Sequence, residues 1–527
     1  MKNRVLSVIE KRLGKKVVLE KPKDKKFGHY ATPVAFSMAK ELRKPPFEIA
    51  KELCEKLKSE EIFAEVEPLK GYINFRLSED FLDSYATAVL KNPERIISPI
   101  GNEKILLEFV SANPTGPLHI GHARGAVIGD ALYRMGKALG YEIKREYYIN
   151  DHGSQVYKLG LSIYLAGRES MGHEVTWPEG CYRGEYVYDL ARDAMETLGR
   201  DHFVDESSVS RLAEWGKDRM MELIVRDLEK VGIYFDSFVS EKSLYDMWPK
   251  VRTVLEEREA LYEKDSKIWL RSTRFGDEKD RVVVREDGRP TYLAGDIIYH
   301  YQKFKRSFDR YINIWGADHH GYIARVKAAI EFLGFDSSKL EIVLAQMVSL
   351  LKGSEPFKMS KRAGNYILMS DVVEEIGKDA LRFMFLSKKS DTHLEFDVET
   401  LKQQDASNPV YYINYAHARV YSLFEKAGAE FGDVIEVELK NMNEEAKDLL
   451  FSALLLPEVV EEAFLKREAN RVTDYLKALA AQFHRFYNEN RVLGSQKERE
   501  LMKLFATVAV SINKGLELLG IEAKKRM

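Results

Sequence analysis

The chain has few features that would place it outside the cytoplasm or in a membrane. Its 527 residues include only two cysteines, Cys54 and Cys181, so a disulfide framework is excluded. It contains no run of about 18 apolar residues, so no membrane span is expected. Residues 1–16 carry charges throughout and lack the apolar stretch of a signal peptide. We therefore expect a cytoplasmic protein.

Several common signatures of nucleotide and metal chemistry are also missing. The glycine patterns GxGxxG and GxxxxGK[ST] are absent, which argues against a dehydrogenase and a P-loop ATPase. There is no HExxH, and the two cysteines are too isolated to complete a zinc site. The formal net charge of −2 means that any RNA binding must use local clusters of cations. The length suggests about three to four domains.

The most informative stretch is SANPTGPLHIGH, residues 111–122. It follows an apolar run at 105–110 that predicts a buried strand, and it precedes apolar residues at helical spacing from Ile120 onward. His119 and His122 would share one face of the first helical turn, where unpaired N–H groups attract phosphate. Gly121 between them leaves room for a flat ring. Taken alone, this pattern is equally typical of a surface loop.

A second stretch, FKMSKRAG at 357–364, would alone suggest a solvated turn. Together with HIGH at 119–122 it resembles the paired signature of class I aminoacyl-tRNA synthetases. Longer segments narrow the resemblance to arginyl-tRNA synthetases, and the likeness runs nearly end to end. These segments are EFVSANPTGPLHIGHAR at 108–124, YINDHGSQ at 148–155, GADHHGYI at 316–323 and NPVYYINYAHAR at 408–419.

The strand and helix patterns and this resemblance predict a multidomain α/β protein. Residues 1–95 are expected to form a small N-terminal α+β domain, with a helix over 30–42, and the resemblance implies that it contacts the tRNA elbow. Residues 96–404 are expected to form a Rossmann-like parallel-sheet catalytic domain, with a mostly helical insertion at about 157–280. Residues 405–527 are expected to form a C-terminal all-α helix bundle, which the resemblance implies binds the anticodon.

The resemblance implies an arginine–tRNA ligase that joins L-arginine to ATP and then transfers the arginyl group to tRNA(Arg). No protein nucleophile is needed, so catalysis is mainly alignment and charge stabilisation. The family pattern assigns this role to His119, His122, Lys358 and Lys361. It assigns ATP binding to His119, Gly121, His122, Asp318, Met359 and Ser360.

Arginine binding is assigned by the same resemblance to Ser111, Asn113, His122, Tyr292, Asp296 and His320. Tyr292 and Asp296 are four residues apart, so they share a face if a helix begins there, and a carboxylate suits the planar guanidinium fork. For tRNA, Asn408, Tyr412, Tyr415 and Arg419 offer aromatic faces and a cation, although aromatics at helical spacing are more often core residues. Mg²⁺ is expected only with ATP, without a protein metal site, and the family pattern suggests a monomer.

Two other functions remain compatible with the residues. One is a class I synthetase for another amino acid, such as cysteine or glutamine. The other is a synthetase-like RNA-binding protein without charging activity, against which the intact set His119, His122, Lys358 and Lys361 argues. Replacing Asp296 separates the first alternative from arginine use, and ATP turnover separates the second.

Overall fold

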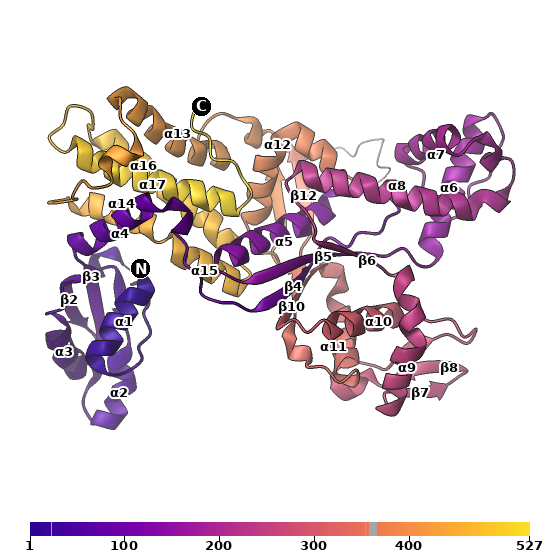
Figure 1. Ribbon diagram of the computed structural model, residues 1–527, viewed down its shortest axis with the longest axis horizontal. Coiled ribbons are helices and arrows are strands. Elements are labelled where there is room, and N and C mark those ends of the chain that lie inside the picture. Colours follow the sequence, from indigo (N-terminus) through magenta and orange to yellow (C-terminus); the bar gives the residue numbers. More distant parts are fainter. Residues whose placement is uncertain (23, 354, 358–365) are drawn as a thin grey trace. The chain divides into compact units, whose positions relative to one another are not determined.

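The computed structural model describes residues 1–22, 24–353, 355–357 and 366–527, and the chain forms two compact units (Figure 1). The first unit comprises Met1–Ser98, Gln404–Lys466 and Arg471–Met527, and the second comprises Pro99–Gln403 and Arg467–Asn470. Within the described residues, no helix combines the length and apolarity that crossing a bilayer requires. Four predicted site residues, Lys358, Met359, Ser360 and Lys361, lie outside the described part of the chain.

The N-terminal part of the first unit contains an antiparallel sheet in the order β1-β3-β2. Its elements are α1 (Lys2–Leu13), β1 (Tyr30–Thr32), α2 (Val34–Leu42), α3 (Pro46–Leu57), β2 (Phe63–Leu69), β3 (Tyr72–Leu77) and α4 (Glu79–Lys91). The helix predicted over 30–42 is wrong at its start, because Tyr30–Thr32 pair with β3. Pro33 explains the difference, since a residue that precedes proline is pushed out of the helical region.

Helices make up the remainder of the first unit (Figure 1). They are α13 (Pro409–Ala427), α14 (Glu444–Leu454), α15 (Leu456–Lys466), α16 (Asn470–Glu489) and α17 (Glu498–Leu518). Long runs of apolar residues on α17, from Met502 to Leu518, are buried, which places this helix in the core of the unit. The helical character predicted for this part of the chain is confirmed.

A five-stranded parallel sheet organises the second unit, in the order β11-β10-β4-β5-β6. The strands are β4 (Lys104–Glu108), β5 (Glu142–Ile149), β6 (Ser237–Ser240), β10 (Arg310–Gly316) and β11 (Leu340–Ala345). The chain runs from β4 outward to β5 and β6 on one side, and from β10 to β11 on the other. The order therefore reverses between β4 and β10, and ligands of such sheets bind at the carboxyl ends of the strands beside this reversal. The predicted Rossmann-like fold is confirmed.

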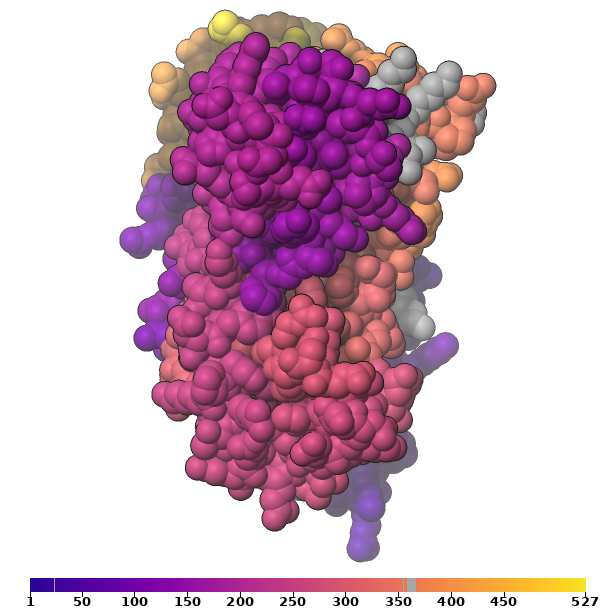
Figure 2. Space-filling model, turned by 90° about the vertical axis from the view of Figure 1, so that its right-hand side faces the viewer, coloured from indigo at the N-terminus to yellow at the C-terminus, as the bar shows by residue number. Residues whose placement is uncertain are grey.

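The segment predicted as a mostly helical insertion, about 157–280, holds both helices and strands. Its first part is helical, with α6 (Ser154–Ser170), α7 (Glu185–Thr197) and α8 (Val209–Lys230). β6 then returns to the main sheet and pairs with β5, and a small sheet follows, formed by β7 (Leu261–Lys264), β8 (Lys267–Leu270) and β9 (Arg281–Val284). These strands are only four residues long, which is too short for a clear alternating pattern. Figure 2 shows the helical part in purple and magenta and the later part in pink.

The other elements of the second unit surround the main sheet. They are α5 (Ile120–Ala138), α9 (Trp248–Glu257), α10 (Tyr292–Lys305), α11 (Ile323–Phe332), β12 (Val348–Lys352), β13 (Glu355–Pro356), α12 (Met369–Leu386) and β14 (Leu394–Asp397). α5 contacts β4, β5 and β10 on one side and α12 on the other. A buried ion pair joins these two helices, because Arg382 donates to Asp130 at 2.5 Å and to the Val231 carbonyl at 2.9 Å.

Replacing Arg382 with methionine should destabilise the second unit. Among the described residues, Asp130 would keep its hydrogen bond from Arg134 and lose that from Arg382, at a site where its own exposed fraction is 1%, and breaking a buried pair typically costs about 3–5 kcal/mol. We expect a clearly lower thermal unfolding temperature by circular dichroism. The matched control is Arg252→Met, which breaks the exposed Arg252–Glu256 pair and should leave the transition in place. Equal effects of both substitutions would contradict this prediction.

Candidate active site

The two histidines of the HIGH stretch lie where β4 leads through a turn into α5. The His119 ring stacks on the His122 ring with 3.6 Å between centroids and 24° between planes. His119 caps the helix, since its Nδ1 accepts from the Gly121 N–H at 3.2 Å, so its proton is on Nε2. A Cβ at Gly121 would lie 3.1 Å from the His119 ring, so glycine allows this stack. The predicted strand, turn and helix are confirmed.

The first-turn N–H groups of α5 are not free, which differs from the expectation for this helix. Ile120 N–H donates to the Ile367 carbonyl at 2.9 Å, Gly121 N–H to His119, and His122 N–H to the His119 carbonyl at 3.0 Å. The reason is that the chain at Ile367 pairs with the turn as an extra strand segment. These backbone N–H groups are therefore already engaged, and the imidazole groups and the helix field are what this turn offers to an anion.

Both imidazoles are neutral at pH 7. Burial lowers the pKa of His119, and burial together with the neighbouring His119 lowers the pKa of His122 to about 3. Among the described residues, no partner reaches the buried Nδ1 of His122. A neutral imidazole still donates one hydrogen bond, so the pair offers polarised N–H groups without a permanent positive charge.

The described residue that follows 358–365 packs against this pair. The Tyr366 ring stacks on His119 with 5.3 Å between centroids, although the residue is 61% exposed. Its neighbours are fixed to the HIGH stretch by the bridge between His119 and Leu368 and by the bond from Met369 N–H to the Leu118 carbonyl, at 2.9 Å. Residues 366–369, which follow the second signature stretch in sequence, therefore contact the HIGH stretch.

The N-terminal turns of α10 carry the predicted guanidinium-binding residues. The helix begins at Tyr292, which is 46% exposed, and Asp296 follows one turn later and is half-buried. No hydrogen-bond donor among the described residues reaches the Asp296 carboxylate. Burial, Glu241 and Glu108 together raise the pKa of Asp296 to about 8. The predicted helix and its shared face are confirmed.

A second carboxylate, Glu241, lies at the carboxyl end of β6 and faces the same helix. It is 2% exposed, and its Oε2 has no partner among the described residues, while Oε1 accepts from the Tyr245 hydroxyl at 3.0 Å. Burial raises the pKa of Glu241 to about 7. A Cβ at Gly295 would lie 2.5 Å from Oε1, so only glycine lets this carboxylate approach α10. Among the described residues, no cation donates a hydrogen bond to either carboxylate, although Arg325 lies near enough to oppose the rise in the pKa of Asp296.

The segment after β4 places Ser111 and Asn113 at the same sheet edge. Ser111 Oγ donates to Glu108 Oε1 at 3.1 Å and accepts from the Tyr148 N–H at 3.1 Å. Asn113 donates to Gln155 Oε1 at 2.8 Å. Both residues are half-buried, so they are partly accessible to solvent at this edge of the sheet.

The segment after β10 is a 3-10 helix, η7 (Ala317–Tyr322), with no buried residue. Asp318 and His319 form a mutual pair at 3.6 Å, and the Asp318 side chain is 82% exposed. His320 is also exposed. The predicted position at the carboxyl end of a central strand is confirmed, while nothing in this segment holds His320 toward a pocket.

The residues predicted to bind tRNA lie on α13 in the first unit. Asn408 is buried and caps this helix, accepting from Val410 and Tyr411 N–H at 3.0 and 3.2 Å, so its position has a structural cause. Tyr415 is 42% exposed and stacks on His484 at 5.4 Å.

Around these rings, a cation completes a surface cluster. The Arg419 guanidinium lies 4.0 Å from the Tyr487 ring centroid and 5.8 Å from that of Tyr415. Tyr412 is half-buried against His484, with 4.6 Å between centroids. Of the four predicted residues, Tyr412, Tyr415 and Arg419 therefore lie together.

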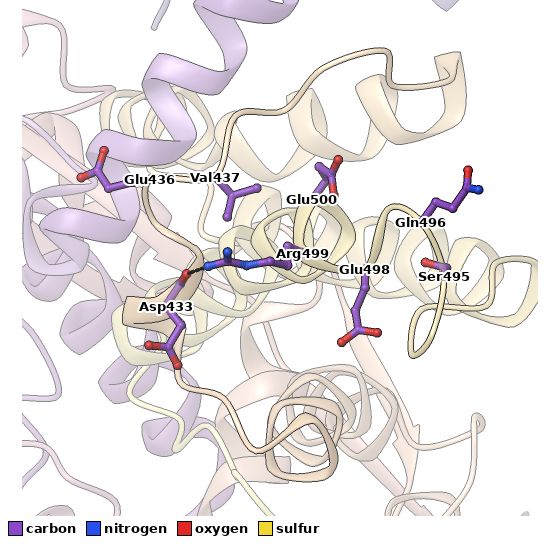
Figure 3. A pocket seen from close by; sticks show the side chains of 8 residues that line it. All are labelled: Asp433, Glu436, Val437, Ser495, Gln496, Glu498, Arg499 and Glu500. Carbon is purple, nitrogen blue, oxygen red and sulfur yellow. Dashed lines mark hydrogen bonds between the residues drawn. The ribbon is translucent and has the colours of Figure 1, made fainter.

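A hollow of about 560 Å³ in the first unit is a different place (Figure 3). It lies beside η11 (Phe431–Val434) and the start of α17, and none of the predicted site residues lines it. Its lining contains four carboxylates and one guanidinium, and Arg499 is held by the Asp433 carbonyl at 2.6 Å. This charge is unfavourable for a nucleic acid backbone.

Comparison with known proteins accounts for the whole chain. Three family models match: the arginyl tRNA synthetase N terminal domain over residues 1–77, the class I (R) tRNA synthetase catalytic domain over 86–422, and the DALR anticodon binding domain over 413–527. The arginine–tRNA ligase of Nitratiruptor sp. is 68% identical over 527 residues, covering 100% of both chains. That of Campylobacter jejuni is 55% identical over 529 residues, again covering 100% of both.

The chain belongs to the arginyl-tRNA synthetase family. The predicted family and enzyme class are therefore confirmed. The solved arginyl-tRNA synthetase structure from Thermus thermophilus has the same fold, with a TM-score of 0.78, 22% identity and 100% coverage of both chains.

Two features of this synthetase site were not found from sequence. Glu241 follows a strand of four half-exposed or exposed residues, so no pattern marked it. Gln155 lies within the YINDHGSQ segment, but only the structure places it against Asn113. What points to Glu241 is its position directly after the four-residue strand β6, which lies within the segment predicted as a mostly helical insertion.

The neutral state of His122 can be tested by NMR with ¹³C-labelled histidine. Because burial lowers its pKa to about 3, its ring signal should not move between about pH 5 and pH 8. The variant His122→Gln assigns the signal by its loss. A midpoint near the ordinary histidine value would contradict the neutral donor role.

Proposed function

We propose that the chain activates L-arginine with ATP and transfers the arginyl group to tRNA(Arg), with the arginine side chain held between Glu241 and Asp296. The observation that carries this proposal is the pair of neighbouring carboxylates, Glu241 buried and Asp296 half-buried, which receive no hydrogen bond from a cation of the described residues and lie on the same sheet edge as the HIGH histidines. A guanidinium has five N–H donors in a planar fork and a permanent charge, so it satisfies both carboxylates at once. Tyr292 borders the same site from α10.

In the first step, the arginine carboxylate oxygen attacks the α-phosphorus of ATP, and the bond to the pyrophosphate oxygen breaks. His119 and His122 donate hydrogen bonds to phosphate oxygens as negative charge develops there. Lys358 and Lys361 neutralise the leaving pyrophosphate, and Met359 and Ser360 belong to the same signature. We assign ribose binding to Asp318 and contact with arginine to His320, both of which follow the carboxyl end of β10. Mg²⁺ enters with ATP and is held mainly by its phosphate oxygens.

At the other end of arginine, Ser111 and Asn113 hold the α-amino group and keep the carboxylate directed at ATP. In the second step, a terminal ribose hydroxyl of tRNA attacks the carbonyl carbon of the adenylate, and AMP leaves. The arginyl ester is then on the tRNA.

We assign the tRNA contacts to the N-terminal and C-terminal parts of the chain. Residues 1–95 would contact the tRNA elbow, residues 96–404 would carry catalysis, and residues 405–527 would bind the anticodon. The Tyr412, Tyr415 and Arg419 cluster supports the last assignment, because exposed rings and a cation suit base stacking and phosphate contact. The enzyme would act as a cytoplasmic monomer, which size-exclusion chromatography with light scattering tests.

The first experiment is aminoacylation of total tRNA with each labelled amino acid and ATP. We expect charging with arginine only, and loss of charging in His122→Ala and Lys361→Ala. Charging with another amino acid would contradict the pocket assignment, and tRNA binding without any charging would favour the non-catalytic alternative.

Arginine use should also depend on pH in a direction set by the two carboxylates. In the free protein the pKa values of Glu241 and Asp296 are about 7 and about 8, and only the ionised forms bind a guanidinium well. Binding therefore releases protons, so the KM for arginine should fall by about tenfold or more from about pH 6 to pH 8.5. Measured arginine KM values at fixed ATP and tRNA test this.

Matched variants identify the groups responsible. Asp296→Asn and Glu241→Gln keep the size of each side chain and remove its charge, so each should raise the arginine KM and flatten its pH dependence. The KM for ATP serves as the internal control. A pH dependence that persists unchanged in both variants would contradict the assignment.

A further inference from the structure

Beneath the arginine pocket lies a buried polar chain that the reaction described above does not use. At its centre is Lys303 of α10, which is 0% exposed. Its ammonium donates to Glu108 Oε2 at 2.6 Å and to Asn313 Oδ1 at 2.8 Å. Glu108 and Asn313 are direct partners on β4 and β10. Lys303 therefore joins the two strands between which the order of the sheet reverses.

On one side, this chain reaches the strained turn after β4. Val110 and Ser111 have φ values of 68° and 42°, which non-glycine residues rarely adopt, and a β-branched valine least of all. Such a backbone persists only where surrounding groups hold it. Glu108 does so, since its other oxygen accepts from the Ser111 hydroxyl at 3.1 Å.

On the other side, the chain reaches the helix turn that carries Asp296. His300 Nε2 lies 3.5 Å from Asn313 Nδ2, and His300 Nδ1 lies 2.8 Å from the Asp296 carbonyl oxygen. The directions agree: Lys303 donates to the Asn313 oxygen, the Asn313 amide donates to Nε2, and Nδ1–H donates to the carbonyl. Burial, together with Lys303, lowers the pKa of His300 to about 3, so the ring is neutral, as this arrangement requires.

We propose that Lys303 is a positioning residue for arginine, because it fixes the two opposite ends of the amino-acid pocket through one buried ammonium group. Through Glu108 it holds the turn that presents Ser111 to the α-amino group. Through Asn313 and His300 it holds the part of α10 that presents Asp296 to the guanidinium. The inference rests on the proposed arginine site.

Lys303 also neutralises the charge of Glu108. Without its ammonium, Glu108 would be a third buried carboxylate near Asp296 and Glu241, and Glu108 already contributes to the raised pKa of Asp296. The nearby Arg306 is engaged with Glu146, its Nη2 donating at 2.8 Å. Among the described residues, Lys303 is the cation that hydrogen-bonds Glu108.

The test compares KM values of the full-length enzyme in aminoacylation with saturating tRNA(Arg). Lys303→Met keeps a chain of similar length and removes the ammonium. We expect the arginine KM to rise about tenfold or more, the scale of losing a hydrogen bond to a charged group, with the ATP KM unchanged. In Glu108→Gln/Lys303→Met the charge of Glu108 is removed together with its partner, so the arginine KM should recover only in part, because the hydrogen bonds of the ammonium to both strands are still missing.

A matched control is Lys503→Met. Lys503 is as buried as Lys303, 1% exposed, and donates to Asp83, Thr87 and the Val437 carbonyl in the first unit. It should lower thermal stability without changing the arginine KM. If Lys303→Met raises the arginine and ATP KM values equally, or the double variant recovers the native arginine KM in full, the positioning role is wrong.

Measuring Asp296→Asn in the same assay distinguishes failure of the inference about Lys303 from failure of the proposed arginine site. If Asp296→Asn raises the arginine KM while Lys303→Met does not, the inference about Lys303 fails and the arginine site stands. If Asp296→Asn leaves the arginine KM unchanged, the proposed arginine site itself fails.

Discussion

The repulsion between Glu241 and Asp296 is the interaction on which the rest of the site depends. Burial is the main cause of the raised pKa of each carboxyl group, and Glu241 raises the pKa of Asp296 further. A flexible site would relax by turning one side chain toward water. Here Gly295 leaves room for Glu241 against α10, and β6, which precedes Glu241, pairs with β5 in the main sheet, so the two carboxyl groups stay close together.

The site offers different kinds of polar group to arginine and to the phosphates. Where arginine would lie, the protein offers two carboxyl groups that ionise fully when a cation binds, because their pKa values are about 7 and about 8. Where phosphates would lie, the described residues offer neutral imidazole, because the pKa of His122 is far below 7. A protonated HIGH pair would attract phosphate more strongly, but it would also repel the guanidinium nearby. Neutral donors strengthen as charge develops on the phosphate, which favours the transition state over the ground state.

Sequence reasoning was most successful where periodic patterns are long. The helix after HIGH and the strand at 311–315 were predicted correctly because apolar spacing continues over many residues. The helical pattern that follows Pro33 extends to the N-terminal side of this proline, which is why the sequence predicts a helix for Tyr30–Thr32. Glu241 was missed because β6 is short, and Lys303 was missed because a lysine near a helix end is usually exposed. Burial of a charged residue depends on its distant partners, which local sequence does not contain.

The choice of two carboxylates for one guanidinium bears on specificity. A single carboxylate binds any cation, including the ammonium of lysine. Two carboxylates presented from β6 and α10 fit a planar group with donors on more than one edge, whereas an ammonium is a compact charge on a longer stem. A neutral isostere of arginine would leave both carboxylates unneutralised, so the site discriminates by the penalty for an incorrect occupant as well as by contacts to the correct one.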